Sequence, residues 1–292
     1  MAKHCITGSS GRIGRAIYAL FSSKGDEVLG LDLIPSLTTD ITGDLRDIDI
    51  LRRAFDGVDT VIHSGALHAP HVGRVSDAEF RSVNVDGTNS VLQAAKASGV
   101  KRVVFTSSTA VYGYASQDET RASWITEDTV PQPRTIYHAT KLEAERIACE
   151  YASKDLPVHI IRMSRCFPEP AQEMAVYRLH RGIDARDVAA AHKAVIEQSS
   201  TPFSLHVISG RHPFERADCE ELRRDAPAVI RHRAPDLARA FERRGWQLPQ
   251  SIDRVYVASK AMSELNWAPK FGYEEVLDQL DNSSTEVLEP IT

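Results

Sequence analysis

The sequence predicts an α/β protein, in which a doubly wound parallel sheet of Rossmann type carries a smaller, discontinuous C-terminal lobe. Three observations lead to this fold class. Short apolar runs alternate with longer amphipathic segments through the first 163 residues, and strands that alternate with helices in this way build parallel sheets. A glycine-rich turn at residues 7–14 follows the first apolar run. Beyond Arg162 the alternation stops, and a proline-rich and then an arginine-rich stretch follow.

The first part of the chain divides into short strands and longer helices. The longest helix has apolar residues at helical intervals, and Gly99 follows it as a C-cap residue would. Because crossovers between parallel strands are right-handed, these elements form layers on both faces of the sheet. We expect strands at His4–Thr7, Glu27–Asp32, Thr39–Thr42, Thr60–His63, Arg102–Thr106 and Val158–Arg162, and helices at Arg12–Ser23, Asp47–Phe55, Asp77–Ser98 and Ile136–Ser153.

The second part of the chain contains the smaller lobe in separate pieces. A helix at Asp187–Gln198, with Asp187 placed to cap it, and a strand at Ser204–Ile208 return to the sheet. The stretch 211–249 is polar, arginine-rich and helical in pattern. We therefore assign residues 1–163, 183–208 and 251–261 to the sheet domain, and residues 164–182, 209–250 and 262–292 to the lobe.

Composition excludes several classes of protein. The chain of 292 residues is 42% hydrophobic and 26% charged, which is ordinary for a globular protein. A net charge of −5 favours neither nucleic acid nor an anionic membrane as a partner. The four cysteines show no metal-ligand spacing, so we predict no metal. No signal-peptide pattern and no run of about 18 apolar residues is present, which favours the cytoplasm.

The glycine-rich turn predicts a dinucleotide site. Its glycines, Gly8, Gly11 and Gly14, permit a tight turn and a close approach of the backbone to a pyrophosphate. The helix that begins at Arg12 and Ile13 presents N–H groups and a positive dipole end to the phosphates. Such a turn is also found without any ligand.

Asp32 strengthens the prediction. It ends the second strand about 20 residues downstream, where an acid binds the ribose hydroxyls of NAD. No cation follows Asp32 to pair with a 2′-phosphate, so we predict NAD rather than NADP, although Arg12 could still reach such a phosphate.

Two further loops are candidates for the cofactor site. Asp44 and Leu45 follow the third strand, where they would suit the adenine amino group and ring face. His63, Ser64 and Gly65 follow the fourth strand, where small residues let the backbone pass close to the cofactor. An ordinary turn explains each of these pairs equally well.

A tyrosine and a lysine predict hydride-transfer chemistry. Tyr137 and Lys141 stand at i and i+4 and project from one helix face. A nearby ammonium lowers the pKa of a phenol from about 10 towards a value useful for acid–base catalysis. The spacing alone also fits a structural helix face. Ser108, at the carboxyl end of the fifth strand, adds a hydroxyl that could hold the reacting substrate oxygen.

Together these motifs resemble the extended short-chain dehydrogenase/reductase superfamily, in its NAD-dependent epimerase/dehydratase family. The ordered set is TGSSGRIG, Asp32, GDLRD, HSGA, Asn84 to Thr88, FTSSTAVYG, YHATK, Arg186-Asp187-Val188 and the C-terminal stretch 258–270. The resemblance implies that Ser108, Tyr137 and Lys141 form a catalytic triad and that Asn84 lies near it. It also implies a homodimer through helices 77–98 and 136–153.

Two departures from the family pattern narrow the reaction. Similar 4,6-dehydratases carry an Asp-Glu pair after the active-site hydroxyl, where this chain has Thr109 and Ala110, which argues against dehydration. After the sixth strand, Arg165 replaces the usual Asn, and only a short segment precedes Arg186. Such a segment suits a smaller substrate, as in family members that oxidise free sugar acids.

Cations near that segment are candidates to bind an anionic substrate, because a guanidinium matches a carboxylate or phosphate. An ion-paired surface is the competing explanation for each of them. The substrate candidates are His68, Ser108, Thr109, Arg165 and Arg186. Other possible anion-binding side chains in this segment are Arg178, His180 and Arg181, and His71 could line the mouth of the site with His68.

Three functions remain open at this stage. The first is an NAD-dependent oxidoreductase that transfers hydride at a hydroxyl carbon of a sugar or sugar-acid-like substrate. The second is an NAD-dependent nucleotide-sugar epimerase, such as a 4-epimerase. The third is a non-catalytic dinucleotide-binding regulator, which the intact Tyr137 and Lys141 argue against.

Overall fold

A seven-stranded, all-parallel sheet forms the centre of the molecule in the computed structural model, which describes residues 2–288. The strands lie in the order β3-β2-β1-β4-β5-β7-β8. β2 and β3 lie on one side of β1, and β4 and the later strands lie on the other. The strand order therefore reverses between β1 and β4, and parallel sheets of this kind bind ligands at such a point. The strands are β1 Lys3–Thr7, β2 Glu27–Asp32, β3 Ile41–Thr42, β4 Thr60–His63, β5 Arg102–Ser108, β7 Val158–Met163 and β8 Phe203–Ile208.

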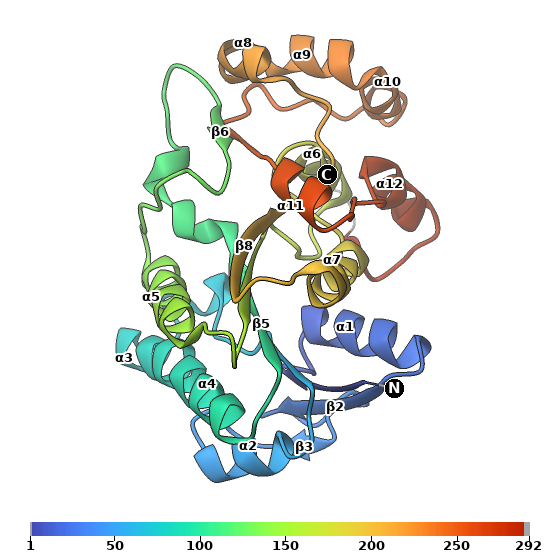
Figure 1. Ribbon diagram of the computed structural model, residues 1–292. Helices are drawn as coiled ribbons and strands as arrows, with labels where there is room; N and C mark the ends of the chain where they lie inside the picture. The colour runs from blue at the N-terminus through green and yellow to red at the C-terminus, as the bar shows by residue number, and fades with distance from the viewer. Residues whose placement is uncertain (1, 289–292) are drawn as a thin grey trace.

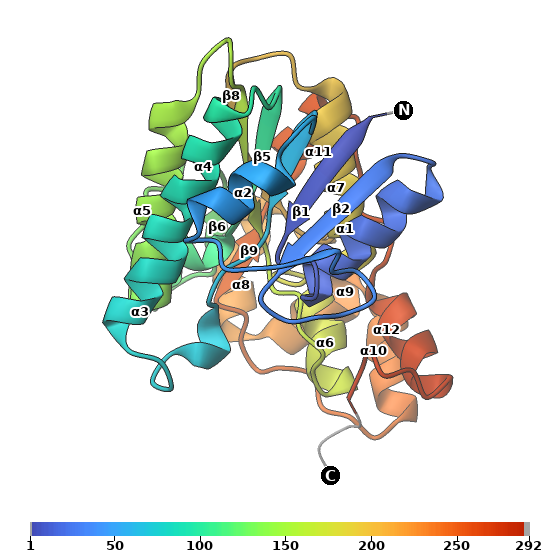
Figure 2. The same ribbon diagram turned by 90° about the horizontal axis from the view of Figure 1, so that it is seen from below.

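Helices cover both faces of this sheet, so the predicted fold class is confirmed (Figures 1 and 2). Figure 2 shows α2, α4 and α5 on one side of the strands and α1 and α7 on the other. The two layers bury separate apolar clusters, one around Phe105 and one around Ile62. The covering helices are α1 Arg12–Ser23, α2 Ile48–Ala54, α3 Asp77–Arg81, α4 Gly87–Ala97, α5 Ile136–Tyr151, α7 Ala185–Gln198 and α11 Ser259–Glu264.

A second lobe lies beyond the carboxyl ends of the strands (Figure 1). It has its own core, in which Phe214, Leu237 and Phe241 are buried. A two-stranded parallel sheet of β6 (Ser123–Ile125) and β9 (Arg254–Tyr256) belongs to this part of the chain. Its helices are α6 Ala171–Arg178, α8 Cys219–Arg224, α9 Ala226–Arg233, α10 Pro235–Arg243 and α12 Tyr273–Asp281.

Most predicted elements are present, with three differences. The third strand is shorter than predicted and covers only Ile41–Thr42. The helix predicted at 77–98 consists of α3, a π-helical turn at Ser82–Asp86, and α4. Asp187 does not cap α7, because Asp184 takes the N-cap position and accepts a hydrogen bond from Arg186 N.

The division into domains differs at both strands of the small sheet, since β6 lies within the predicted sheet domain 1–163. Residues 251–261 were assigned to the sheet domain, but β9 within them pairs with β6, and Val255 packs in the core of the lobe. Ala258 and Ala261, in contrast, pack against the sheet domain. Of the lobe segment 262–292, residues 289–292 lie outside the described structure.

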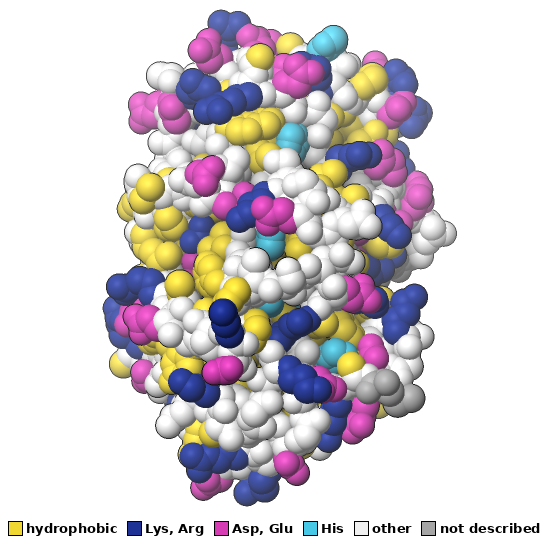
Figure 3. All heavy atoms as spheres, viewed as in Figure 1, with side chains coloured by type: hydrophobic (Ala, Val, Ile, Leu, Met, Phe, Trp, Pro, Cys, Tyr) yellow, Lys and Arg dark blue, Asp and Glu magenta, His cyan; other side chains and the backbone are white. Residues whose placement is uncertain are grey.

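The surface carries both signs of charge. Figure 3 shows Lys and Arg side chains intermixed with Asp and Glu over one whole face of the molecule. Among residues 2–288, no helix is both long and apolar enough to cross a bilayer.

Candidate active site

The glycine-rich turn forms a tight cradle between β1, β4 and α1. Gly8 has a φ of +73°, and a Cβ atom there would lie 2.5 Å from Gly65 N. A Cβ on Gly14 would lie 2.1 Å from Gly8 O, so α1 packs directly on the turn. Gly11 is the N-cap residue of α1 and supplies no side-chain acceptor to the first N–H groups of the helix. The turn therefore leaves room and N–H donors for an anionic group.

Asp32 lies beside this cradle, as the sequence predicts. Its Oδ2 accepts a hydrogen bond from Ser10 N at 3.0 Å, and its Oδ1 accepts one from Ile34 N at 3.0 Å. The two bonds fix the carboxylate next to the glycine turn. The loop that follows exposes Leu33, Ile34 and Leu37 and contains no lysine or arginine.

The side chains that begin α1 point away from Asp32. Arg12 forms an ion pair with Glu286, 2.5 Å away, and its guanidinium also contacts the Cys166 thiol. The guanidinium that the sequence offers for a 2′-phosphate is thus engaged by the C-terminal segment. Ile13 packs into the apolar core beneath the turn.

The loop after β3 contributes an apolar side chain rather than a free carboxylate. The Asp44 carboxylate accepts hydrogen bonds from Arg46 Nε at 2.9 Å and Nη2 at 2.6 Å, and these bonds lower the pKa of Asp44. Leu45 is buried and lies against Gly65, where a Cβ would approach Leu45 Cδ1 to 2.9 Å. Leu45 therefore lies beside the cradle, whereas the Asp44 carboxylate is paired with Arg46.

The loop after β4 begins at His63, whose ring is enclosed. Both ring nitrogens of His63 are used inside the protein, Nδ1 with Thr7 Oγ1 at 2.7 Å and Nε2 with Thr88 Oγ1 at 3.0 Å. Burial lowers the pKa of His63 to about 3. The ring therefore fixes β4 from within the core. Ser64 donates to Thr7 O at 2.7 Å, which holds the next turn of backbone against the glycine loop.

Ser108 and Tyr137 come together at the carboxyl edge of the sheet. Ser108 is the last residue of β5, and Tyr137 lies in the first turn of α5, which Thr135 caps. Burial raises the pKa of the Tyr137 phenol, and a hydrogen bond with Ser108 opposes this rise. A hydroxyl and a phenol thus face the same point above the sheet.

Lys141 follows one turn later on the same helix. Its Nζ donates a 2.7 Å hydrogen bond to Thr106 O and lies 4.4 Å from the centre of the Phe105 ring. Burial lowers the pKa of Lys141 to about 8, and the charge of Glu145 opposes this shift. At neutral pH the side chain is mainly an ammonium ion, although its pKa lies close to the physiological range.

Asn84 lies in the π-helical turn between α3 and α4. Its Oδ1 accepts from Leu67 N at 2.8 Å, and its Nδ2 donates to Leu67 O at 2.9 Å and to Thr140 Oγ1 at 3.2 Å. Asn84 thereby joins the loop after β4 to the helix that carries Tyr137. The sequence did not predict the π turn, because a single residue of extra winding leaves the helical pattern intact.

The loop between β7 and α6 contacts the loop after β4. The His68 ring stacks on Phe167, with ring centres 5.7 Å apart, and Lys141 is among the groups that lower the pKa of His68, after burial. The Arg165 guanidinium lies 5.4 Å from the Phe167 ring centre and donates through Nε to Glu169 Oε1 at 2.6 Å. The Arg165 side chain is 45% exposed, so it keeps N–H groups for a further partner.

The remaining substrate candidates are less accessible. Thr109 is buried, and its carbonyl lies 3.5 Å from the Tyr256 hydroxyl. Arg178 is buried against Asp184 at 3.1 Å, and His180 Nδ1 bonds to Arg254 O at 2.8 Å.

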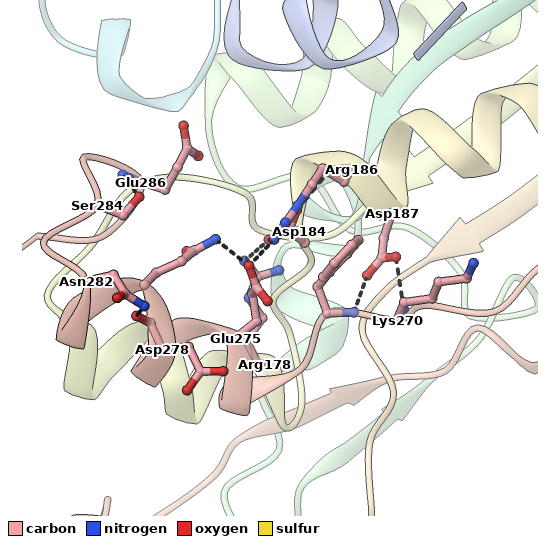
Figure 4. A network of polar contacts seen from close by, with 12 residues as sticks. Arg178, Asp184, Arg186, Asp187, Lys270, Glu275, Asp278, Asn282, Ser284 and Glu286 are labelled. Carbon is pink, nitrogen blue, oxygen red and sulfur yellow. Dashed lines mark hydrogen bonds and ion pairs between the residues drawn. The ribbon is translucent and has the colours of Figure 1, made fainter. Parts of the chain in front are cut away.

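Arg186 belongs to a network that joins α7 to α12, shown in Figure 4. It donates to Asp184 at 2.9 Å and to Glu275 at 2.6 Å, and it lies 3.6 Å from the centre of the Phe271 ring. The Arg186 guanidinium is thus engaged by two carboxylates and an aromatic ring.

The sequence analysis overlooked a buried ion pair behind Lys141. Arg162 Nη2 donates to Glu145 Oε2 at 2.6 Å, and both side chains are almost fully buried. An arginine inside an otherwise apolar strand, and a glutamate four residues after Lys141, are the signals that could have revealed it. Within residues 2–288, no group of three or more His, Cys, Asp or Glu side chains is arranged to hold a metal ion.

The chain is similar in sequence to a known family and to several curated proteins. Residues 4–178 match the model of the NAD dependent epimerase/dehydratase family. A UDP-glucose 4-epimerase of Streptomyces lividans is 30% identical over 156 residues, which cover 50% of this chain and 46% of the epimerase. An L-arabinose 1-dehydrogenase (NAD(P)(+)) of Haloferax volcanii is 31% identical over 169 residues, 53% of this chain and 63% of the dehydrogenase. The matches thus span about half the length of these curated relatives.

A solved structure extends the likeness to almost the whole chain. A short-chain dehydrogenase/reductase superfamily protein from Agrobacterium tumefaciens, solved with bound NAD, has a TM-score of 0.72 at 22% identity. The likeness covers 96% of each chain. At this identity it supports the fold, including that of the second lobe.

Proposed function

The chain belongs to the NAD dependent epimerase/dehydratase family, and from this premise we propose that it is an NAD-dependent oxidoreductase acting at a hydroxyl carbon of a sugar or sugar-acid-like substrate. The observation that carries the proposal is the hydrogen bond between Ser108 and Tyr137 at the carboxyl edge of the sheet, with Lys141 one helical turn after Tyr137 on α5. Each of these three side chains has a distinct task in the reaction.

The residues around the cradle fit a dinucleotide. Gly8 and Gly14 let the loop after β4 and α1 pack directly on the turn, where a Cβ would clash, and the N–H groups of α1 would bind the pyrophosphate. The Asp32 carboxylate would accept hydrogen bonds from the ribose hydroxyls. Leu45 and Gly65 would lie beside the cofactor. NAD is favoured over NADP because the loop after Asp32 contains no cation and Arg12 pairs with Glu286. When bound, the nicotinamide supplies the hydride acceptor.

The side chains of the chain itself manage the proton. Tyr137, as phenolate, would take the proton from the substrate hydroxyl, and Ser108 would hold the same oxygen in place. The Lys141 ammonium would add a positive charge that favours the phenolate and would bind the ribose next to the nicotinamide. Thr109 and Ala110 cannot ionise, so the site lacks the extra acid and base that dehydration needs.

The surface formed by Arg165, His68 and Phe167 indicates the class of substrate. Only α6 and short loops separate β7 from α7, which leaves little chain to hold a nucleotide. Arg165 keeps exposed N–H groups at this surface, and a guanidinium matches a carboxylate. His68 and Phe167 form a flat surface beside it. A sugar acid fits these features.

The test is a panel of free sugars, sugar acids and nucleotide sugars, with NADH formation as the signal. We expect turnover with the free sugar acids, and a loss of about 100-fold or more in kcat for Tyr137→Phe, because one positioned acid–base group contributes that much. Arg231→Gln, a change on an exposed side chain of α9, serves as the control. Equal turnover in wild type and Tyr137→Phe would contradict the proposed mechanism.

A nucleotide-sugar 4-epimerase is the second candidate. It is favoured by the S. lividans relative, and it would use the same three side chains. Such an enzyme returns the hydride and forms no net NADH. Product analysis after incubation with UDP-sugars separates the two functions, because only the epimerase converts the sugar without net redox change.

We also propose a homodimer that associates through the α3–α4 region and α5. These helices already pack side by side, with the Tyr151 hydroxyl donating to Asn89 at 3.1 Å. Sedimentation equilibrium should give twice the mass of one chain. Charged residues introduced at the exposed Gln93 and Cys149 should weaken the association and lower the measured mass.

A further inference from the structure

A buried ionic network connects the elements that carry Ser108 and Lys141. The Glu145 and Arg162 side chains are only 4% and 7% exposed. Arg162 donates to Glu145 through Nη2 at 2.6 Å and through Nε at 3.0 Å, and the Ser107 hydroxyl donates to Glu145 Oε1 at 2.5 Å. The remaining Arg162 nitrogen, Nη1, donates to the Tyr112 hydroxyl at 3.1 Å. Every member is therefore held by at least one hydrogen bond.

The network lies next to the catalytic side chains at two points. Ser107 directly precedes Ser108 on β5 and stands opposite Arg162 on β7. Glu145 follows Lys141 by one helical turn on α5, so the two side chains leave the same face of the helix. The network therefore ties the end of β5 to the helix that carries Tyr137 and Lys141.

Lys141 nevertheless bonds to the backbone and not to Glu145. Its Nζ donates to Thr106 O at 2.7 Å, while both carboxylate oxygens of Glu145 are taken by Arg162. Without Arg162, a carboxylate at i+4 would draw the ammonium into a direct salt bridge, away from the site. Arg162 thus holds the negative charge near Lys141 without letting it capture the ammonium.

The other groups around Lys141 do not supply a negative charge. Burial favours the neutral amine, and the two imidazoles near Lys141 are themselves neutral at pH 7, since burial lowers the pKa of each. The titratable and charged groups that act on Lys141 or its carboxylate neighbour are Glu145 of α5, His63 of β4, His68 of the following loop, Tyr112 after β5 and Arg162 of β7.

We propose that Glu145, held by Arg162 and Ser107, is a positioning residue that keeps the side chain of Lys141 an ammonium ion while leaving it directed into the active site. The inference rests on the role given to Lys141 in the proposed function. It assigns to Glu145 a task in proton chemistry, although Glu145 itself touches neither substrate nor cofactor in that mechanism.

The sign of the effect follows from charge. In Glu145→Gln the carboxylate is lost and Arg162 becomes an unpaired cation behind Lys141, so both changes disfavour the ammonium. In Arg162→Gln the carboxylate is left unpaired and favours it. The two substitutions at one ion pair therefore shift the titration of Lys141 in opposite directions.

The experiment is an NMR titration of the protein labelled with 13C at the lysine Cε, with Lys141→Met used to identify the Lys141 signal. An opposite charge nearby shifts a pKa by about one unit or more. We expect the pKa of Lys141 to fall by about one unit in Glu145→Gln, to stay near the wild-type value in Glu145→Asp, and to rise in Arg162→Gln. The alkaline limb of kcat/KM should move with it.

Asp184→Asn is the matched control, because it breaks the Arg178–Asp184 pair, which is equally buried but lies elsewhere. It should leave the titration of Lys141 unchanged. An unchanged titration in folded Glu145→Gln overturns the proposal, and so does an equal fall in Glu145→Asp. If Glu145→Gln fails to fold, an unchanged or lowered titration in Arg162→Gln overturns it. The titration needs no substrate, so failure of the proposed function would appear separately, as a lack of turnover.

Discussion

At the scale of single residues, burial decides which polar side chains are available for chemistry. His63 and Ser108 both stand at the carboxyl ends of central strands. The His63 ring is enclosed and bonded at both nitrogens, whereas the Ser108 hydroxyl meets Tyr137 at a partly open edge. Sequence position alone made both of them candidates, and only the packing separates them.

His63 should make the folded protein sensitive to acid. Its pKa in the folded protein, about 3, lies below the ordinary value of 6.5, so the unfolded chain binds the proton first as pH falls. The stability that the neutral ring contributes is complete above about pH 6.5 and is lost progressively towards pH 3. Between pH 7 and pH 5 we expect the free energy of unfolding to fall by roughly 2 kcal/mol through this residue.

Urea denaturation at the two pH values checks this expectation. His63→Asn cannot be protonated, so it should be less stable than wild type at pH 7 but should lose less stability on acidification. Other buried histidines, such as His192, contribute equally to both proteins and cancel in the difference. The same loss in both proteins would show that His63 is already exposed to protons in the folded state.

At the scale of elements, the π-helical turn at Ser82–Asp86 is the feature that brings the loop after β4 onto the active site. Extra winding turns the side chain of Asn84 inward, where both of its polar groups bond to the backbone of Leu67. Such turns occur frequently at functional sites. Here the turn sets the position of the segment that carries His68.

Replacing Asn84 should loosen that loop. In Asn84→Ala the half-buried N–H and C=O of Leu67 lose their partners, which destabilises the fold by about 1 kcal/mol. Hydrogen exchange of residues 66–71 should accelerate more than exchange in α4, and turnover should fall because His68 is no longer held. Thr88→Val, which removes another buried hydroxyl of the same region, provides the comparison. Uniform acceleration in both regions would mean that Asn84 stabilises only the helix.

Elements with a strong local pattern were predicted from the sequence, and elements that depend on distant partners were not. α1 has the predicted bounds because its apolar face, its glycine turn and its length are all local. β6 and β9 are three residues each and exist only because they pair with one another across the chain. In the same way Tyr137 and Lys141 became candidates through their spacing and Ser108 through its place at a strand end, whereas the pairing of Glu145 with Arg162 needed the folded sheet.

At the scale of the whole molecule, the position of α12 depends on the short segment 267–271 that lies against α7. The carboxylate of Asp187 accepts from Lys270 N at 2.9 Å and from Phe271 N at 3.0 Å, and Trp267 Nε1 donates to Asp187 O at 3.2 Å. Arg186 then reaches Glu275 from the next position. Two neighbouring residues on α7 therefore hold the last described helix of the chain, as Figure 4 shows.

These two residues should differ in their effect, because Asp187 is buried and Arg186 is exposed. Asp187→Ala leaves two N–H groups without their acceptor, and we expect a loss of about 2–4 kcal/mol in stability and rapid proteolysis near residues 267–272. Asp187→Asn keeps one acceptor oxygen, so its loss of stability should lie between those of wild type and Asp187→Ala. Arg186→Ala removes ion pairs on an exposed side chain, so the loss should stay below about 1 kcal/mol, with KM unchanged for every substrate. A raised KM in Arg186→Ala would restore the substrate role that the sequence suggested, and equal proteolysis of all variants would show that α12 is held by its apolar face alone.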